Sequence, residues 1–347
     1  MRLLKWLAVP LLALLVAAAV LIYIKQPHTP PIRTDGGETA SPGIASLEEV
    51  ELGGVPQWIL IRGQDRSNPV LLFLHGGPGM PMMYLAHAFQ RPLEDDFVVV
   101  QWDRRGAGKT FRKDLTPEEL SVSRMLSDTE ELVRLLRRRF GRDKVYLAGH
   151  SFGSYLGMLF ARRHPELLHA FIGIGQVVDG EAARTIQEEF IRDRARATGR
   201  TEAIEEIDSK GHAAFESWLF EFGAELKDAS SWWPLLWTGI KAPEYSLLDA
   251  ARVPQGSGFS SRHMSYDVVD GALIDHVTAV EIPVYFFTGR HDYTTPFALV
   301  ENYLQVLDAP RKEIVWFEDS AHFPFFEQPG EFAESLKRVR DETYPAR

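Results

Sequence analysis

The segment most suited to covalent chemistry is VYLAGHSFG, which runs from Val145 to Gly153. Its apolar first half is typical of a buried strand. The apolar residues after it recur at helical spacing, so Ser151 falls on a sharp strand-to-helix turn. Such a turn holds the serine in a strained conformation, and Gly149 and Gly153 lack the Cβ atoms that would keep strand and helix apart. The pattern predicts an exposed hydroxyl nucleophile at Ser151.

A serine nucleophile needs a general base and an acid that orients the base. His322 follows the last predicted strand in the loop DSAHFP, from which it could return to the serine. Asp292 follows the predicted strand 284–288 in the turn GRHDY and is the favoured acid. Asp179 and Asp319 remain alternatives for that role.

The tetrahedral intermediate of acyl transfer also needs main-chain N–H donors. The amide of Phe152 is one candidate, because it lies at the start of a helix, where the helix dipole favours negative charge. The second donor is expected from the loop HGGPG, His75–Gly79, after the predicted strand 70–74. Its glycines let the main chain turn an N–H group inward and approach the substrate closely.

The composition of the chain argues against several kinds of site and partner. The chain has no cysteine, which excludes disulfides, thiolate metal sites and a cysteine nucleophile. Its formal net charge of -10 argues against a nucleic-acid partner. No His, Asp and Glu residues have metal-ligand spacing, so no metal or other cofactor is expected. Composition says nothing of the oligomeric state.

The first 46 residues are predicted to lie outside the folded domain. Trp6–Ile24 is an uninterrupted apolar run preceded by Arg2 and Lys5, and its length is close to the roughly twenty residues that span a bilayer. A retained membrane anchor at 1–25 is favoured over a cleaved signal peptide. The first would hold the catalytic domain on the extracytoplasmic side, and the second would secrete it. The Pro- and Gly-rich segment 26–46 predicts a tether.

From residue 47 onward, strand and helix patterns alternate, which predicts a doubly wound, mostly parallel sheet. This core is expected at 47–177 and 266–347. The segment 178–265 is helical in pattern and rich in aromatic residues. We expect it to form a helical lid inserted after the sixth strand, at the carboxyl edge of the sheet. The predicted strands lie at 47–52, 57–62, 70–74, 97–102, 144–148, 170–175, 284–288 and 313–317.

Together these motifs resemble the α/β-hydrolase superfamily, and within it the proline iminopeptidase-like branch of serine exopeptidases. The resemblance extends from about residue 47 to residue 336 and implies an α/β-hydrolase fold. The motifs that carry it are HGGPG at 75–79, WDRRGAG at 102–108, GHSFGS at 149–154, GRHD at 289–292 and AHFP at 321–324.

The resemblance also implies a role for each site residue. Ser151 is the implied nucleophile, and Asp292 and His322 complete a catalytic triad. The main-chain amides of Gly77 and Phe152 form the implied oxyanion hole.

The sequence departs from the family pattern at several positions. Phe152 stands where family members usually have Trp, and Lys109-Thr110 stands where they usually have Ser. Iminopeptidases also hold the free amino group of the substrate with lid glutamates in an acidic and aromatic stretch, and no such stretch stands out in 178–265. The lid glutamates that are candidates by charge alone are Glu188, Glu189, Glu216, Glu221 and Glu244.

These motifs and departures are compatible with three functions. The favoured one is a serine hydrolase that acts through an acyl-enzyme on small amide, peptide or ester substrates. The alternatives are a proline iminopeptidase-type aminopeptidase and a non-catalytic protein that uses the hydrolase fold to bind a ligand. The expected partners are a small-molecule or short-peptide substrate and, through the N-terminal segment, a membrane.

Overall fold

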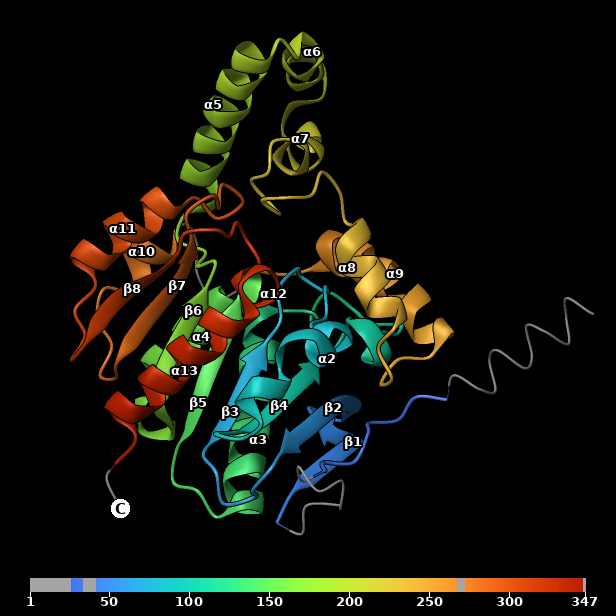
Figure 1. Cartoon of the computed structure of the whole chain (residues 1–347), viewed down its shortest axis with the longest axis vertical. Coiled ribbons are helices and arrows are strands. Elements are labelled where there is room, and N and C mark those ends of the chain that lie inside the picture. The colour runs from blue at the N-terminus through green and yellow to red at the C-terminus, as the bar shows by residue number, and fades with distance from the viewer. Residues whose placement is uncertain (1–25, 34–41, 267–271, 346–347) are drawn as a thin grey trace, which may run out of the picture.

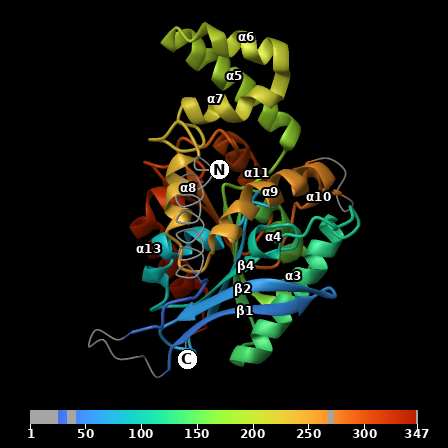
Figure 2. The ribbon, with the colours of Figure 1, turned by 90° about the vertical axis from the view of Figure 1, so that its right-hand side faces the viewer.

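The computed structural model describes residues 26–33, 42–266 and 272–345 of the chain. The described strands are β1 (Ile44–Leu52), β2 (Val55–Gly63), β3 (Val70–Leu74), β4 (Val98–Asp103), β5 (Val145–His150), β6 (Leu168–Ile174), β7 (Val284–Gly289) and β8 (Lys312–Phe317). They form one sheet in the order β1-β2-β4-β3-β5-β6-β7-β8 (Figure 1). The β1–β2 and β2–β4 pairs are antiparallel, and all later pairs are parallel. Figure 2 shows β1 and β2 side by side along one edge.

Helices connect the parallel strands, as such crossovers require. The described α-helices are α2 (Ala86–Phe89), α3 (Val122–Phe140), α4 (Phe152–Arg163), α5 (Gly180–Thr198), α6 (Thr201–Lys210), α7 (Phe215–Glu221), α8 (Trp233–Ile240), α9 (Leu247–His263), α10 (Leu273–His276), α11 (Phe297–Val306), α12 (Pro324–Glu327) and α13 (Pro329–Thr343). This arrangement confirms the predicted α/β-hydrolase fold with a mostly parallel sheet.

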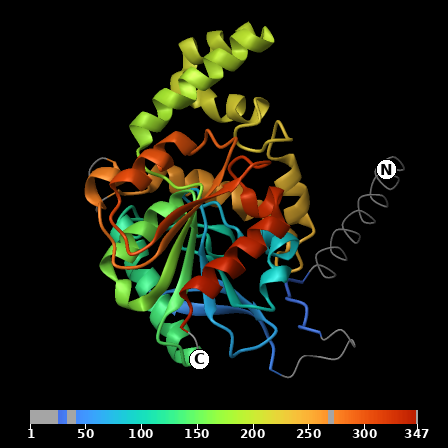
Figure 3. The same cartoon turned by 60° about the vertical axis from the view of Figure 1, so that its left-hand side comes forward.

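The central strands β3 to β7 are buried on both faces and supply two separate cores. In β3, Leu72 and Leu74 belong to the core that includes α3 and α4. Leu71 and Phe73 belong to the core on the other face, where α13 crosses the sheet (Figure 3). The alternation follows from the two-residue period of a strand. A continuous apolar run is therefore the sequence that such a strand needs.

The chain between β6 and β7 includes the helices α5 to α10. In Figure 1, α5, α6 and α7 stand above the sheet, beyond the ends of β6 and β7. These helices share a small core of their own, which includes Ile191, Ile207 and Leu219. By contrast, α9 contacts the main domain, where the hydroxyl of Ser260 donates a hydrogen bond to the carbonyl of Gly106 at 3.0 Å. The segment is thus attached at α9 and projects at α5 and α6.

Residues 26–33, which the sequence predicted as part of a tether, contact both β2 and the loop between α8 and α9. The N–H group of His28 donates to the carbonyl of Pro243 at 2.9 Å. The Arg62 guanidinium donates to the hydroxyl of Thr29 at 2.6 Å. These contacts give this segment a fixed place beside β2.

The expected membrane anchor requires a correction. Among the described residues, no helix is both long enough and apolar enough to cross a membrane. The long helices α3 and α5, of 19 residues each, carry many charged side chains. The run Trp6–Ile24, on which the prediction rested, lies outside the described residues. The predicted membrane anchoring, the membrane partner, and the extracytoplasmic or secreted location inferred from the same run are therefore not supported.

Candidate active site

Ser151 lies on the turn between β5 and α4 in the strained conformation that the sequence predicts. Its φ is 53° and its ψ is -123°, and its N–H group donates to the carbonyl of Ile174 at 2.9 Å. The main chains of β5, α4 and the end of β3 pass very close to one another at this turn. A Cβ atom on Gly149 would lie 2.3 Å from the carbonyl oxygen of Gly153, and one on Gly153 would lie 2.1 Å from that of Leu74. Only glycine therefore fits at either position.

The glycine loop after β3 lies directly beside the serine. A Cβ atom on Gly76 would lie 3.0 Å from the Cβ of Ser151. The next residue, Gly77, has a φ of 107°, a region that L-residues rarely adopt. Phe152 is the first residue of α4, so its amide lies in the first turn of that helix. The structure thus brings both predicted oxyanion donors to the neighbourhood of Ser151; their role stays a prediction.

His322 and Asp292 come together in the loops that follow β8 and β7. Nδ1 of His322 lies 2.9 Å from Oδ2 of Asp292, and both side chains are buried. Thr295 completes the environment of the carboxylate, because its main-chain N–H donates to Oδ1 and its hydroxyl to Oδ2, each at 2.8 Å. The carboxylate is therefore held by three donors when Nδ1 of His322 carries a hydrogen.

Main-chain contacts fix the position of His322 as well. Nε2 of His150 lies 2.9 Å from the carbonyl oxygen of His322, and the two rings are 4.6 Å apart. Burial keeps the pKa of His150 well below its usual value, so its neutral ring can donate this bond. On the other side, the N–H group of His322 donates to the carbonyl of Glu225 at 3.1 Å.

The charge of His322 depends on two opposing effects. Burial alone would lower its pKa, because a buried charge is poorly solvated. The neighbouring carboxylate of Asp292 acts in the opposite direction, and Glu225 adds a further negative charge nearby. The pKa of His322 is consequently raised to about 9. The imidazole of His322 is therefore mainly protonated at neutral pH.

The alternative acids have other contacts. Asp179 is the N-cap of α5, where its Oδ1 accepts from the N–H groups of Glu181 and Ala182 at 2.9 and 3.0 Å. Asp319 is exposed and forms an ion pair with Lys227 at 2.5 Å. Of the three aspartates proposed from the sequence, Asp292 is the one that contacts His322 in the described structure.

A cavity of about 330 Å³ opens over Ser151. The glycine loop, His322 and the segment between β6 and β7 contribute to its wall, so residues far apart in sequence meet there. Apolar side chains make up about half of its lining. They include Met80, Met82, Tyr84, Leu85, Phe215, Leu219, Trp232 and Phe323.

Two carboxylates also line this cavity. Glu225 is buried, and burial raises its pKa to about 7, although the nearby His322 opposes the shift. The Thr294 hydroxyl donates a hydrogen bond to it. Glu216 is exposed at the rim and accepts from Nε1 of Trp232 at 2.7 Å. The cavity therefore combines an apolar wall with negative charge close to His322.

The sequence identified only one of these two carboxylates. Glu216 was among the glutamates proposed by charge, whereas Glu225 was not, because no motif surrounds it. The other candidates, Glu188, Glu189, Glu221 and Glu244, are not among the residues that line the cavity at Ser151.

The sequence analysis did not identify Thr295 either. Its position three residues after Asp292 was a usable signal, because an aspartate side chain in a turn often accepts hydrogen bonds from the residues that follow it.

No metal site accompanies these groups in the part of the chain that the structure describes, where no three His, Asp or Glu side chains could hold an ion together. The chemistry available at the site is that of a hydroxyl, an imidazole and carboxylates.

Gly175 gives a test of this geometry. It has a φ of 52°, and a Cβ atom there would lie 2.7 Å from Nδ1 of His322 and 3.2 Å from Oδ2 of Asp292. Gly175→Ala should therefore displace the imidazole, and a misplacement of about 1 Å can cost about 100-fold in rate. We expect labelling of Ser151 by a serine-directed fluorophosphonate to slow at least about tenfold.

Gly199→Ala is the matched control. Gly199 also has a positive φ, 72°, but no atom lies within 4 Å of the added Cβ. This substitution should lower stability by about 1 kcal/mol and leave the labelling rate unchanged. Equal labelling rates in the two variants would contradict the arrangement described here.

Comparison with known proteins places the chain in a family. A sequence model described as "Alpha/beta hydrolase family" matches residues 71–335. The probable aminopeptidase YbaC of Bacillus subtilis (strain 168) is 30% identical over 307 residues, which cover 85% of this chain and 96% of that protein. The proline iminopeptidase of Saccharolobus solfataricus is 25% identical over 300 residues, with 82% and 87% of the two chains covered.

A solved structure shares the fold. The crystal structure of proline iminopeptidase from Mycobacterium smegmatis covers 86% of this chain and 98% of its own, with a TM-score of 0.64 and 20% sequence identity. The fold, the family match and the YbaC relative agree with one another. The chain therefore belongs to the alpha/beta hydrolase family, in its proline iminopeptidase-like part, and is a hydrolase.

Proposed function

We propose that the protein is a serine aminopeptidase that releases the N-terminal residue of short peptides. The observation that carries this proposal is the buried Glu225, which lines the same cavity as Ser151 and His322. A free ammonium group that enters a partly desolvated cavity needs an opposite charge. The names of the relatives YbaC and proline iminopeptidase point to the same activity.

The proposed reaction uses Ser151, His322 and Asp292 as a triad. His322 takes the proton of the serine hydroxyl as Oγ bonds to the substrate carbonyl carbon. The amides of Gly77 and Phe152 donate to the resulting oxyanion. His322 then gives its proton to the leaving nitrogen as the C–N bond breaks. Water attacks the acyl-enzyme with the same base, which releases the amino acid and restores Ser151.

Asp292 has two tasks in this scheme. Its hydrogen bond to Nδ1 leaves Nε2 free to accept the serine proton, and its charge stabilises the imidazolium that forms. The helix that begins at Phe152 adds a favourable dipole for the oxyanion. We further propose that 178–265 acts as a lid, since its residues contribute both the carboxylates and part of the apolar wall.

Glu225 and Glu216 are the proposed sites for the substrate's ammonium group. A group with a pKa near 7, as burial gives Glu225, ionises readily when a cation arrives beside it. The exposed Glu216 would add attraction at the entrance. The apolar wall would then surround the side chain of the N-terminal residue.

A second candidate is an esterase or amidase without need of a free amine. The apolar side chains around the cavity favour this reading, because burial of an apolar acyl group contributes about 25 cal/mol per Å² on its own. The two functions differ in one property that can be measured, the dependence of the rate on a free amino group.

The triad is tested by substitution of each member. Ser151→Ala should abolish fluorophosphonate labelling and hydrolysis, and His322→Ala nearly so. Asp292→Asn should lower kcat by about 10⁴-fold, because the imidazole loses the correct tautomer. Asp179→Asn is the matched control, since Asn also caps helices well and should leave kcat near the wild-type value. A severe effect of Asp179→Asn with a mild effect of Asp292→Asn would reassign the acid.

The pH profile follows from the raised pKa of His322. The base works only when neutral, so kcat/KM on an uncharged aryl ester should rise with pH until about 9. Glu225→Gln removes a negative charge that favours the imidazolium, so its profile should shift to lower pH. If the acid limb of the wild-type profile gave a pKa of about 6.5, the ordinary value for histidine, this account of the site would be contradicted.

The amine dependence distinguishes the two candidate functions. Alanyl and prolyl arylamides should be cleaved at least about 100-fold faster than their N-acetylated counterparts, a difference of about 2.7 kcal/mol. Glu225→Gln should reduce cleavage of the free amines and leave short-chain aryl esters largely unaffected at alkaline pH.

Glu221→Gln is the control, because Glu221 is an exposed lid residue paired with Arg200. It should match the wild type on every substrate. Equal rates on free and acetylated substrates would favour the esterase or amidase instead.

A further inference from the structure

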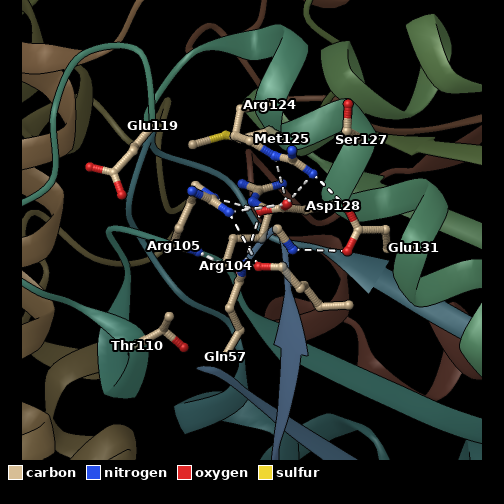
Figure 4. A network of polar contacts seen from close by, with 12 residues as sticks. Gln57, Arg104, Arg105, Thr110, Glu119, Arg124, Met125, Ser127, Asp128 and Glu131 are labelled. Atoms are coloured by element: carbon tan, nitrogen blue, oxygen red, sulfur yellow. Dashed lines mark hydrogen bonds and ion pairs between the residues drawn. The ribbon is translucent and has the colours of Figure 1, made fainter. Parts of the chain in front are cut away.

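Two consecutive arginines after β4, Arg104 and Arg105, are both buried but differ in their partners. Arg105 forms an ion pair with Asp128, whose Oδ2 lies 2.5 Å from its Nε. Gln57 and Arg124 also donate to this carboxylate, so its charge is well compensated (Figure 4). Arg104 has no carboxylate partner within the described part of the chain.

The side chain of Arg104 is 1% exposed. Its Nη2 donates to the carbonyl of His75, but its Nε and Nη1 have no hydrogen-bond partner among the described residues. Burial lowers its pKa to about 9, which still leaves it charged at neutral pH. A buried charge without an opposite charge is costly and rarely retained without a role.

The surroundings of Arg104 point to that role, because they are the supports of the oxyanion hole. Its guanidinium carbon lies 5.6 Å from the centre of the Phe152 ring. The carbonyl that it holds belongs to His75, at the start of the glycine loop. Arg104 therefore lies against the side chain of Phe152 and holds the first residue of the loop that contains Gly77.

A chain of hydrogen bonds leads from Arg104 to one of these donors. Its main-chain N–H lies 3.3 Å from Nε2 of His75, and Nδ1 of His75 lies 2.9 Å from the carbonyl oxygen of Gly76. An N–H group can only donate and a carbonyl only accept, so these two contacts fit the neutral tautomer with hydrogen on Nδ1. Nη2 of Arg104 also lies 3.1 Å from Nδ1 but cannot donate to it in this tautomer, so its hydrogen bond goes to the carbonyl of His75. A bond to the Gly76 carbonyl polarises the peptide that it shares with the N–H of Gly77.

We propose that Arg104 is a positioning residue of the oxyanion hole, which holds the glycine loop through His75 and places an uncompensated positive charge behind the Gly77 and Phe152 amides. The inference rests on the proposed serine-hydrolase function. In a site of low dielectric, a fixed charge of this kind favours the negative charge that develops on the substrate oxygen. The paired Arg105 cannot act in this way, because Asp128 cancels its field.

Three variants separate the charge from the contact. Arg104→Met removes both, Arg104→Gln retains a donor without the charge, and Arg104→Lys retains the charge. With a short-chain aryl ester, Arg104→Met should lower kcat about tenfold or more and change KM by less than about twofold, because the oxyanion exists only after the ground state. Arg104→Gln should also be slow, and Arg104→Lys should recover most of kcat.

The fluorophosphonate labelling rate should follow the same order, since that reaction also places negative charge on an oxygen in the hole. Arg62→Met is the matched control, because Arg62 is a buried arginine on β2 that pairs with Glu94 away from the site. It should lower the unfolding temperature but leave kcat unchanged.

The possible results are separable. A folded Arg104→Met with wild-type kcat, or an Arg104→Lys as slow as Arg104→Met, would overturn the inference. If Arg104→Met does not fold, the comparison of Arg104→Gln with Arg104→Lys decides, since equal kcat values would exclude a role for the charge. A wild-type protein that neither labels nor hydrolyses would instead overturn the proposed function itself.

Discussion

The close crossing of β5, α4 and β3 at Ser151 is the constraint on which the site depends. The side chain of Ser151 can project from the sheet edge only if its main chain adopts a positive φ, and that conformation is stabilised from outside the turn. Gly149 and Gly153 allow the approach, and the bond from the Ser151 amide to Ile174 ties the turn to β6. Because α4 starts at this point, the same turn also sets where the Phe152 amide lies.

The sequence predicted those features that depend on residues close together in the chain, and it missed those that depend on how distant segments pack. The strands and the turn at Ser151 were predictable, because apolar runs and glycines act through their immediate neighbours. Glu225 was not, because its place beside His322 follows from how the segment between β6 and β7 folds back over the sheet. The anchor prediction relied on the apolar run Trp6–Ile24 and the basic residues before it, which lie outside the described residues, and no described helix is long and apolar enough to cross a membrane.

His322 and Glu225 are coupled through charge, and this coupling gives the proposed aminopeptidase a link between binding and catalysis. Without substrate, Glu225 helps to keep His322 protonated and therefore inactive as a base. A substrate ammonium beside Glu225 would offset that negative charge. The pKa of His322 would then fall toward the working range, so that the base becomes available when the correct substrate is bound.

The buried charges of this protein differ in whether a neighbouring opposite charge cancels them. Arg105 and Asp128 cancel each other, and their pairing orders the loop after β4 without a field beyond it. His322 and Asp292 form a second such pair. Arg104 and Glu225, by contrast, form no ion pair among the described residues, and both lie beside the candidate active site. An unpaired buried charge is expensive, so Arg104 and Glu225 are better explained by charges that appear during the proposed reaction than by stability. An oxyanion beside Arg104 and an ammonium beside Glu225 would each supply the missing counter-charge.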